Sequence, residues 1–89
     1  MPAYRVEWLP SAARDFRRIA PDLRRRIAPR VDDLSRNPRP HDTKKLRGSG
    51  ALFRLRVGDY RIVYEVDDQA GLVTIAHVGH RQDVYRRLR

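Results

Sequence analysis

The chain has 89 residues, and 20 Lys or Arg against 11 Asp or Glu give it a formal charge of +9 at pH 7. This length corresponds to a single domain over residues 1–89, too small to enclose a large substrate cavity, so any active site is expected on the surface. With 40% hydrophobic residues the chain is too apolar to be a disordered basic tail. Cysteine is absent, which excludes disulfide frameworks, thiolate nucleophiles and cysteine-based metal sites.

The excess of positive charge predicts an anionic partner. The first ten residues, MPAYRVEWLP, contain no basic segment followed by an apolar run, and no apolar stretch approaches the roughly 18 residues of a membrane span. We therefore expect a cytoplasmic protein without a membrane association. Its partners are expected to be nucleic acid or an acidic protein, in preference to a membrane surface.

The first half of the chain predicts one strand and two helices. Apolar and polar residues alternate over residues 4–8, which is typical of a strand. A helix then begins at Pro10 and ends before Pro21, where a second helix starts. Apolar residues of the second helix recur at spacings of four, four and three: Leu23, Ile27, Val31 and Leu34. Because Pro29 lies inside this pattern and removes a backbone hydrogen bond, we expect a kink or a split there.

The second half predicts a polar linker and a meander of strands. The linker covers residues 38–50, and the strands cover residues 52–57, 60–67 and 72–79. Gly58 and Asp59 suit a two-residue type II′ turn between the first two of these strands. The predicted fold class is α+β, in the order β-α-α-β-β-β, with an antiparallel sheet and two N-terminal helices packed on one face.

The Gly58-Asp59 turn fixes the register of its hairpin and separates two faces. Directly opposite pairs are Val57 with Tyr60, Arg56 with Arg61, Leu55 with Ile62, Arg54 with Val63 and Phe53 with Tyr64. One face is then apolar, and the other carries Arg54, Arg56 and Arg61. Like charges that face each other destabilise a sheet, yet three guanidinium groups on one face can bind a phosphate through charge-assisted hydrogen bonds. On the hairpin alone, a phosphate site and a merely solvated basic face are equally favoured.

The segment after the last predicted strand favours a functional role. It brings an imidazole, a guanidinium and a phenol, from His80, Arg81 and Tyr85, back to the sheet. His is the side chain best suited to proton transfer near neutral pH, and Tyr can stack on a nucleic-acid base. His77 and His80 are three residues apart on a strand and would point to opposite faces, so a metal pair is not expected.

Five segments taken together resemble the RelE branch of the RelE/ParE toxin superfamily. They are Lys45-Leu46-Arg47-Gly48, Leu52-Phe53-Arg54-Leu55-Arg56, Tyr60-Arg61-Ile62-Val63-Tyr64, Val78-Gly79-His80-Arg81 and Val84-Tyr85. The resemblance covers nearly the whole chain. It implies a small bacterial toxin of a type II toxin-antitoxin pair, with the β-α-α-β-β-β fold. RelE toxins cleave mRNA in the ribosomal A site, inhibit translation and are neutralised by a bound antitoxin.

The resemblance also implies roles for single residues. Arg61 and Arg81 match arginines that hold the scissile phosphate, and Tyr85 matches a tyrosine that stacks on a substrate base or assists the transfer. Arg54 and Arg56 stand where the best-known members carry lysines. Because arginine is a poor proton acceptor at neutral pH, the residue that activates the nucleophile stays open.

The reaction implied is attack by an RNA 2′-hydroxyl on the adjacent phosphorus, without a metal or other cofactor. For His80 two roles are open, as the base or acid or as a contact to the RNA backbone, and Glu65 is a lesser candidate. Lys44, Lys45 and Arg47 are expected to bind RNA, and the antitoxin is expected to present an acidic segment. The helix arginines form either a solvated surface or contacts to ribosomal RNA.

Two other functions remain open for this sequence. One is non-enzymatic inhibition of DNA gyrase, as in the ParE branch of the same superfamily. The other is a basic nucleic-acid-binding module without toxicity. The segment from Gly79 to Tyr85 favours the endoribonuclease, because a gyrase inhibitor has no need of it.

Overall fold

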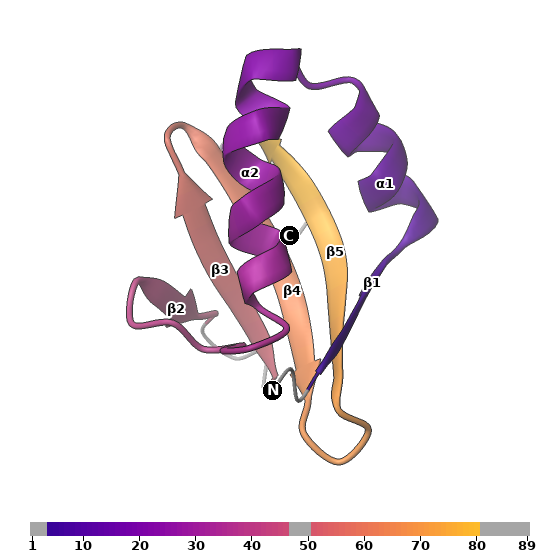
Figure 1. Cartoon of the computed structure of the whole chain (residues 1–89), viewed down its shortest axis with the longest axis vertical. Coiled ribbons are helices and arrows are strands. Elements are labelled where there is room, and N and C mark those ends of the chain that lie inside the picture. Colours follow the sequence, from indigo (N-terminus) through magenta and orange to yellow (C-terminus); the bar gives the residue numbers. More distant parts are fainter. Residues whose placement is uncertain (1–3, 47–50, 81–89) are drawn as a thin grey trace.

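A mixed sheet and two helices make up the described part of the computed structural model, which comprises residues 4–46 and 51–80. In chain order the elements are β1 (Arg5–Trp8), α1 (Pro10–Arg17), α2 (Pro21–Asp33), β2 (Thr43–Lys45), β3 (Leu52–Val57), β4 (Tyr60–Asp67) and β5 (Leu72–His80). Both helices lie on one face of the sheet (Figure 1). The predicted α+β class is confirmed, and β2 is an added strand within the segment predicted as a linker.

The five strands are arranged in the order β1-β5-β4-β3-β2, with β1 and β2 at the edges. The pairs β2–β3, β3–β4 and β4–β5 are antiparallel, as predicted for the meander. However, β1 runs parallel to β5, from Arg5 opposite Leu72 to Trp8 opposite Ile75. The sheet is therefore mixed and not wholly antiparallel. A pairing between strands so far apart in the chain leaves no local sequence pattern from which its direction can be read.

The helices supply one side of the core. Ala12 of α1 and Ile27 and Val31 of α2 are buried and belong to one cluster with the inward side chains of β3, β4 and β5. α2 continues through Pro29 without a split. Pro29 is exposed, and the buried residues on either side of it hold the helix against the sheet despite the missing hydrogen bond. Neither described helix is long and apolar enough to cross a membrane.

The β3–β4 hairpin confirms the predicted register at all five pairs, from Phe53 with Tyr64 to Val57 with Tyr60. Gly58 in the turn has a φ of 59°, the left-handed conformation that a type II′ turn requires at its first central residue. Every described non-glycine residue, including Asp59, has a negative φ. Leu55, Ile62 and Tyr64 on the inward face are fully buried.

A polar cluster fastens the segment between α2 and β2 to the sheet. The hydroxyl of the buried Tyr64 donates a hydrogen bond of 2.8 Å to the carbonyl oxygen of Pro38. The next residue, Arg39, donates two hydrogen bonds to the carboxylate of Asp68, at 3.1 and 2.8 Å. The Tyr4 hydroxyl donates a third to Asp68 at 2.6 Å, and Arg39 also lies over the Phe53 ring, 5.4 Å from its centre. The segment that leads to β2 is thus held at three points.

Candidate functional site

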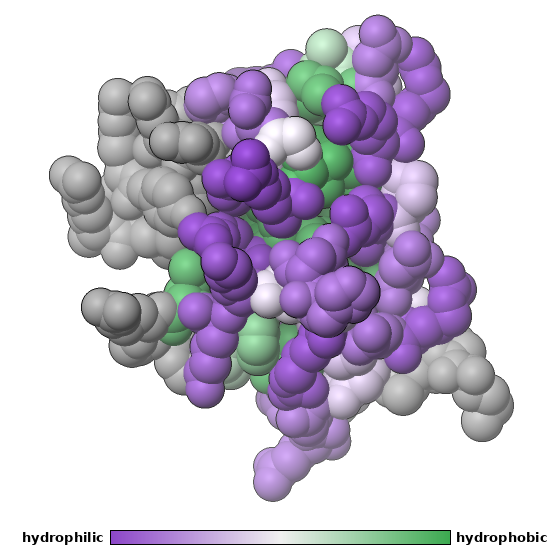
Figure 2. Space-filling view, turned by 90° about the vertical axis from the view of Figure 1, so that its left-hand side faces the viewer, coloured by the Kyte–Doolittle hydropathy of each residue, from purple (hydrophilic) through white to green (hydrophobic). Residues whose placement is uncertain are grey.

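Basic side chains gather on the face of the sheet opposite the helices. Cross-strand partners share a face, so one row consists of Lys44, Arg54, Val63 and His77, and the next of Arg56, Arg61 and Gly79. We call Lys44, Arg54, Arg56 and Arg61 the cationic face. Figure 2 views the molecule from the left-hand side of Figure 1, where the described surface is mainly hydrophilic.

Arg61 is the buried member of the cationic face. Arg61 is 5% exposed, and it is the only buried charged residue among those that the structure describes. Its Nη1 donates a long hydrogen bond of 3.4 Å to the Tyr60 carbonyl oxygen, and its Nε is buried without an acceptor in the part of the chain that the structure describes. Within residues 4–46 and 51–80 no carboxylate forms an ion pair with Arg61 or Arg56. A buried guanidinium without a carboxylate is costly, and a bound anion would relieve that cost.

The strand neighbours of Arg61 are a glycine and a second arginine. Its partner on β5 is Gly79, which has no side chain, and its partner on β3 is Arg56. The Arg56 Nε donates to the Gly58 carbonyl oxygen at 3.3 Å, a weak contact at an exposed position. Two guanidinium groups directly across a strand pair, with glycine on the third strand, can hold a phosphate between them.

His77 joins this face and was missed as a candidate from the sequence. Val63 pairs with His77 whereas Tyr64 pairs with Ile75, so Ala76 is an extra residue in a β-bulge. His77 therefore lies on the face of Val63 and Arg61 and is partly exposed. A sequence signal exists, because the buried positions Val73 and Ile75 are followed by Val78, and this change of phase indicates a bulge.

The structure brings some of the predicted site residues together and separates others. Arg54, Arg56 and Arg61 share one face, as the register required, and Lys44 lies opposite Arg54. Glu65 is on the same face and exposed. Lys45 faces the other way, and His80 lies opposite Tyr60 on the helix side, with ring centres 5.9 Å apart in an edge-to-face contact. Arg47, Arg81 and Tyr85 lie outside the described residues.

Shifted pKa values are found at Asp68, Tyr4, Asp42 and Tyr64, which are not members of the cationic face. Hydrogen bonds from Arg39 and Tyr4 lower the pKa of Asp68, and the Asp68 carboxylate in turn raises the pKa of Tyr4. The ion pair with Arg30 lowers the pKa of Asp42, and burial raises the pKa of Tyr64. In the part of the chain that the structure describes, no three His, Asp or Glu side chains are grouped so as to hold a metal ion.

Comparison with known proteins places the chain in a family. A family model described as the ParE toxin of type II toxin-antitoxin systems matches residues 6–85. Toxin RelG of Mycobacterium tuberculosis is 34% identical over 85 residues, 94% of this chain and 98% of that protein. The mRNA interferase toxin RelE of Escherichia coli K12 is 28% identical over 82 residues, 90% of this chain and 85% of that protein.

A solved structure agrees with these sequence matches. The RelE chain of the archaeal RelE–RelB complex from Pyrococcus horikoshii is 30% identical and superimposes with a TM-score of 0.79, covering 89% of this chain and 96% of that one. The chain belongs to the RelE/ParE superfamily of type II toxin-antitoxin toxins. Within that superfamily its similarities are to RelE-type toxins, as the sequence segments predicted.

Proposed function

We propose that this toxin is an mRNA interferase, a ribosome-dependent endoribonuclease that holds the scissile phosphate of mRNA on the cationic face. One observation carries the proposal: Arg61 is 5% exposed, its Nε has no acceptor among the described residues, and it shares a face with Arg54, Arg56 and Lys44. A buried arginine without a carboxylate does not stabilise a fold, but it can bind a phosphate through charge-assisted hydrogen bonds. The relative from Escherichia coli, named an mRNA interferase, supports the same function.

The proposed chemistry is an internal transfer at phosphorus. The RNA 2′-hydroxyl loses its proton and attacks the adjacent phosphorus, and the bond to the 5′-oxygen breaks. That oxygen takes up a proton from the base or from water, so the products carry a 2′,3′-cyclic phosphate and a 5′-hydroxyl. Arg61 and Arg56 stabilise the negative charge that grows on the phosphate oxygens. By the family resemblance Arg81 shares this role, and Tyr85 stacks on a base of the substrate.

The proton of the 2′-hydroxyl needs an acceptor, and we assign it to His77. The same face of the sheet otherwise offers Lys44, three arginines and Glu65. An arginine is a poor base at neutral pH, and Glu65 lies four residues along β4 from Arg61. His77 lies in the row next to Arg61 and diagonal to it across β4 and β5, a spacing that long side chains can bridge. His80, the candidate from the sequence, lies on the other face of the sheet, where the role of an RNA-backbone contact suits it better.

Two histidine variants test this assignment against each other. His77→Ala is expected to lower the cleavage rate by about 10² to 10⁴, the usual contribution of a general base, and to remove the pH dependence near neutrality. His80→Ala is the matched control on the same strand and is expected to retain the pH profile. The assignment to His77 is wrong if the two variants exchange these results in a single-turnover assay with translating ribosomes.

For the toxin's partner we propose an antitoxin with an acidic contact segment. The net charge of +9 favours such a partner. Relatives support it, since the Pyrococcus horikoshii protein was solved as a RelE–RelB complex.

Inhibition of DNA gyrase is a second candidate, because the matching family model is that of ParE toxins. Induced expression in a bacterial host separates the two functions. We expect primer extension on a reporter mRNA to show cuts in translated codons, absent when translation initiation is blocked. Intact mRNA together with gyrase-dependent DNA breaks would establish the second function instead.

A further inference from the structure

The face of the sheet opposite the helices carries its two signs of charge at separate ends. Beyond the two rows of the cationic face, the next row of cross-strand neighbours consists of Leu52, Glu65, Thr74 and Glu7. Asp67 follows two residues later on β4 and shares this face. We call the three carboxylates, Glu7, Glu65 and Asp67, the acidic end, and all three residues are exposed.

Glu65 differs from the other two carboxylates of the acidic end. Glu7 forms an exposed ion pair with Arg5 at 3.1 Å, and Asp67 accepts a hydrogen bond of 3.0 Å from a backbone amide of the β4–β5 turn. In the part of the chain that the structure describes, Glu65 forms no ion pair. Among those residues its negative charge is therefore uncompensated, although the next row on the same face is cationic.

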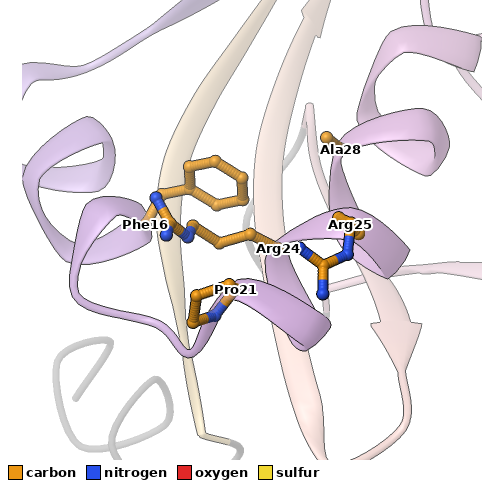
Figure 3. A pocket seen from close by; sticks show the side chains of 5 residues that line it. All are labelled: Phe16, Pro21, Arg24, Arg25 and Ala28. Atoms are coloured by element: carbon orange, nitrogen blue, oxygen red, sulfur yellow. The ribbon is translucent and has the colours of Figure 1, made fainter.

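Along α2, by contrast, charges of both signs are mixed. Arg25 forms an ion pair with Asp22, three residues earlier on the same helix. Arg24 lines an apolar recess of about 320 Å³, and in Figure 3 its side chain extends past the Phe16 ring. Charge is thus sorted by row on the sheet but not on this helix, so the sheet face has a direction for a charged ligand.

The rows show which direction a polyanion can take. The longer cationic row crosses four strands, from Lys44 on β2 to His77 on β5. Neighbouring strands are about 4.8 Å apart, so this row spans roughly 14 Å. Along β4, however, Arg61 is followed four residues later by Glu65, at a distance of roughly 13 Å. A phosphate backbone is therefore attracted when it crosses the strands and repelled when it follows β4.

We propose that Glu65 ends the RNA path: the bound strand crosses the sheet between β2 and β5 over the cationic face, and Glu65 turns it away from the rest of β4. This inference rests on the proposed function, because it takes RNA as the ligand of the cationic face, and it adds the direction and the limit of the path. Repulsion by Glu65 restricts the toxin to a short single-stranded segment. Glu65 is then a positioning residue that does not touch the reacting atoms.

Affinity for RNA strands of increasing length tests this limit. The probes are 2′-O-methyl oligouridylates of about 4 to 16 nucleotides, which lack the attacking hydroxyl and cover the usual range of single-strand sites. Glu65→Gln removes the charge with little change of shape, and Glu65→Lys reverses it. Asp32→Asn and Asp32→Lys are the matched controls, because Asp32 on α2 is exposed and has no ion pair among the described residues.

In the wild type, affinity should rise with length and level off once the strand covers the cationic face. Glu65→Gln should bind the shortest oligomer within about twofold of the wild type and the longest about 3-fold more tightly, because one repulsion is lost. Glu65→Lys should bind the longest about 10-fold more tightly and steepen the salt dependence by about 0.7 in log K against log salt. The Asp32 variants should follow the wild type at every length.

Arg61→Ala, measured with the same oligomers, separates this inference from the function on which it rests. If binding needs Arg61 but the Glu65 variants match their Asp32 controls at every length, the limit set by Glu65 is wrong and the proposed function stands. If Arg61→Ala binds every oligomer as tightly as the wild type, RNA does not occupy the cationic face, and both proposals are overturned.

Discussion

At the scale of single residues, the cationic face carries a cost in stability. Arg56 and Arg61 are directly opposite each other, and like charges in that position destabilise a strand pair by about 0.2 to 1 kcal/mol. Arg61 is also buried without a carboxylate among the described residues. Such an arrangement is expected where a site is kept for binding a ligand at the expense of the fold.

Arg56→Glu should therefore stabilise the protein and impair its function. The new carboxylate replaces a repulsion with an attraction toward Arg61, so the free energy of unfolding should rise by about 0.5 to 1 kcal/mol, measured by urea denaturation. Arg56→Gln only removes the repulsion, so its free energy of unfolding should lie between those of the wild type and Arg56→Glu. A loss of stability in Arg56→Glu would show that Arg61 already has its charge compensated.

The cluster around Asp68 gives a pH dependence of stability. Because Arg39 and Tyr4 lower its pKa, Asp68 contributes stability that is present above the ordinary carboxyl pKa of about 4 and is lost as the pH falls through the lowered value. Tyr4, whose pKa Asp68 raises, contributes stability that is lost as the pH rises above about 10.

Asp68→Asn should thus have a lower melting temperature than the wild type between about pH 5 and pH 9. The two curves should converge as the pH falls below about 4, which thermal unfolding across a pH series would show. The same difference at pH 3 as at pH 7 would mean that the Asp68 carboxylate charge does not stabilise the fold.

Residues near each other in the chain were predictable, and residues joined by distant contacts were not. The two-residue turn dictated the five hairpin pairs, including Arg56 with Arg61. The Arg39–Asp68 contact joins a linker to a turn 29 residues later, and no local pattern encodes it. The face on which His77 lies could be predicted only from the break in the alternation of apolar residues between Ile75 and Val78.

At the scale of elements, α2 shows tertiary packing overriding a local signal. Pro29 in a helix interior predicts a kink or a split, and the split does not occur, because the helix runs from Pro21 to Asp33. Ile27, Val31 and the following Leu34 are buried on its inner side and stabilise the continuous helix. Likewise β2 forms in a polar segment because Lys44 and its neighbours pair with β3, which the sequence of the linker does not reveal.

Pro29→Ala should stabilise α2, since alanine restores the hydrogen bond to the Arg25 carbonyl and removes the steric conflict. We expect the free energy of unfolding to rise by about 1 to 3 kcal/mol, below or near the usual cost of an interior proline. Chemical denaturation with far-UV circular dichroism would measure it. A value equal to or below that of the wild type would indicate that α2 has adapted its backbone to proline.

At the scale of the whole molecule, the net charge of +9 divides between two layers. The sheet carries the cationic face on one side, and the two helices, with their own arginines, lie over the other side (Figure 1). Composition alone predicts only an anionic partner. The fold adds that Arg54, Arg56 and Arg61 lie together on one face of the sheet, apart from the arginines of the helices.

Binding of RNA by the cationic face should depend strongly on salt. Four phosphate contacts, to Lys44, Arg54, Arg56 and Arg61, predict a slope of roughly −3 for log K against log salt with a single-stranded oligomer. Lys44→Ala should reduce the slope by about 0.7. Arg14→Ala, on the helical layer, should leave it unchanged, and an equal reduction in both variants would point to diffuse binding over the whole surface.

The most direct test of the central claim is cleavage of a defined mRNA on purified ribosomes by the wild type and by Arg61→Ala. The wild type should cut the A-site codon and leave a 2′,3′-cyclic phosphate, and Arg61→Ala should react about 10² to 10³ times more slowly at saturating ribosome concentration. Arg14→Ala controls for the loss of one positive charge. Cleavage by Arg61→Ala at the wild-type rate would contradict the account, because the buried arginine would then have no part in the reaction.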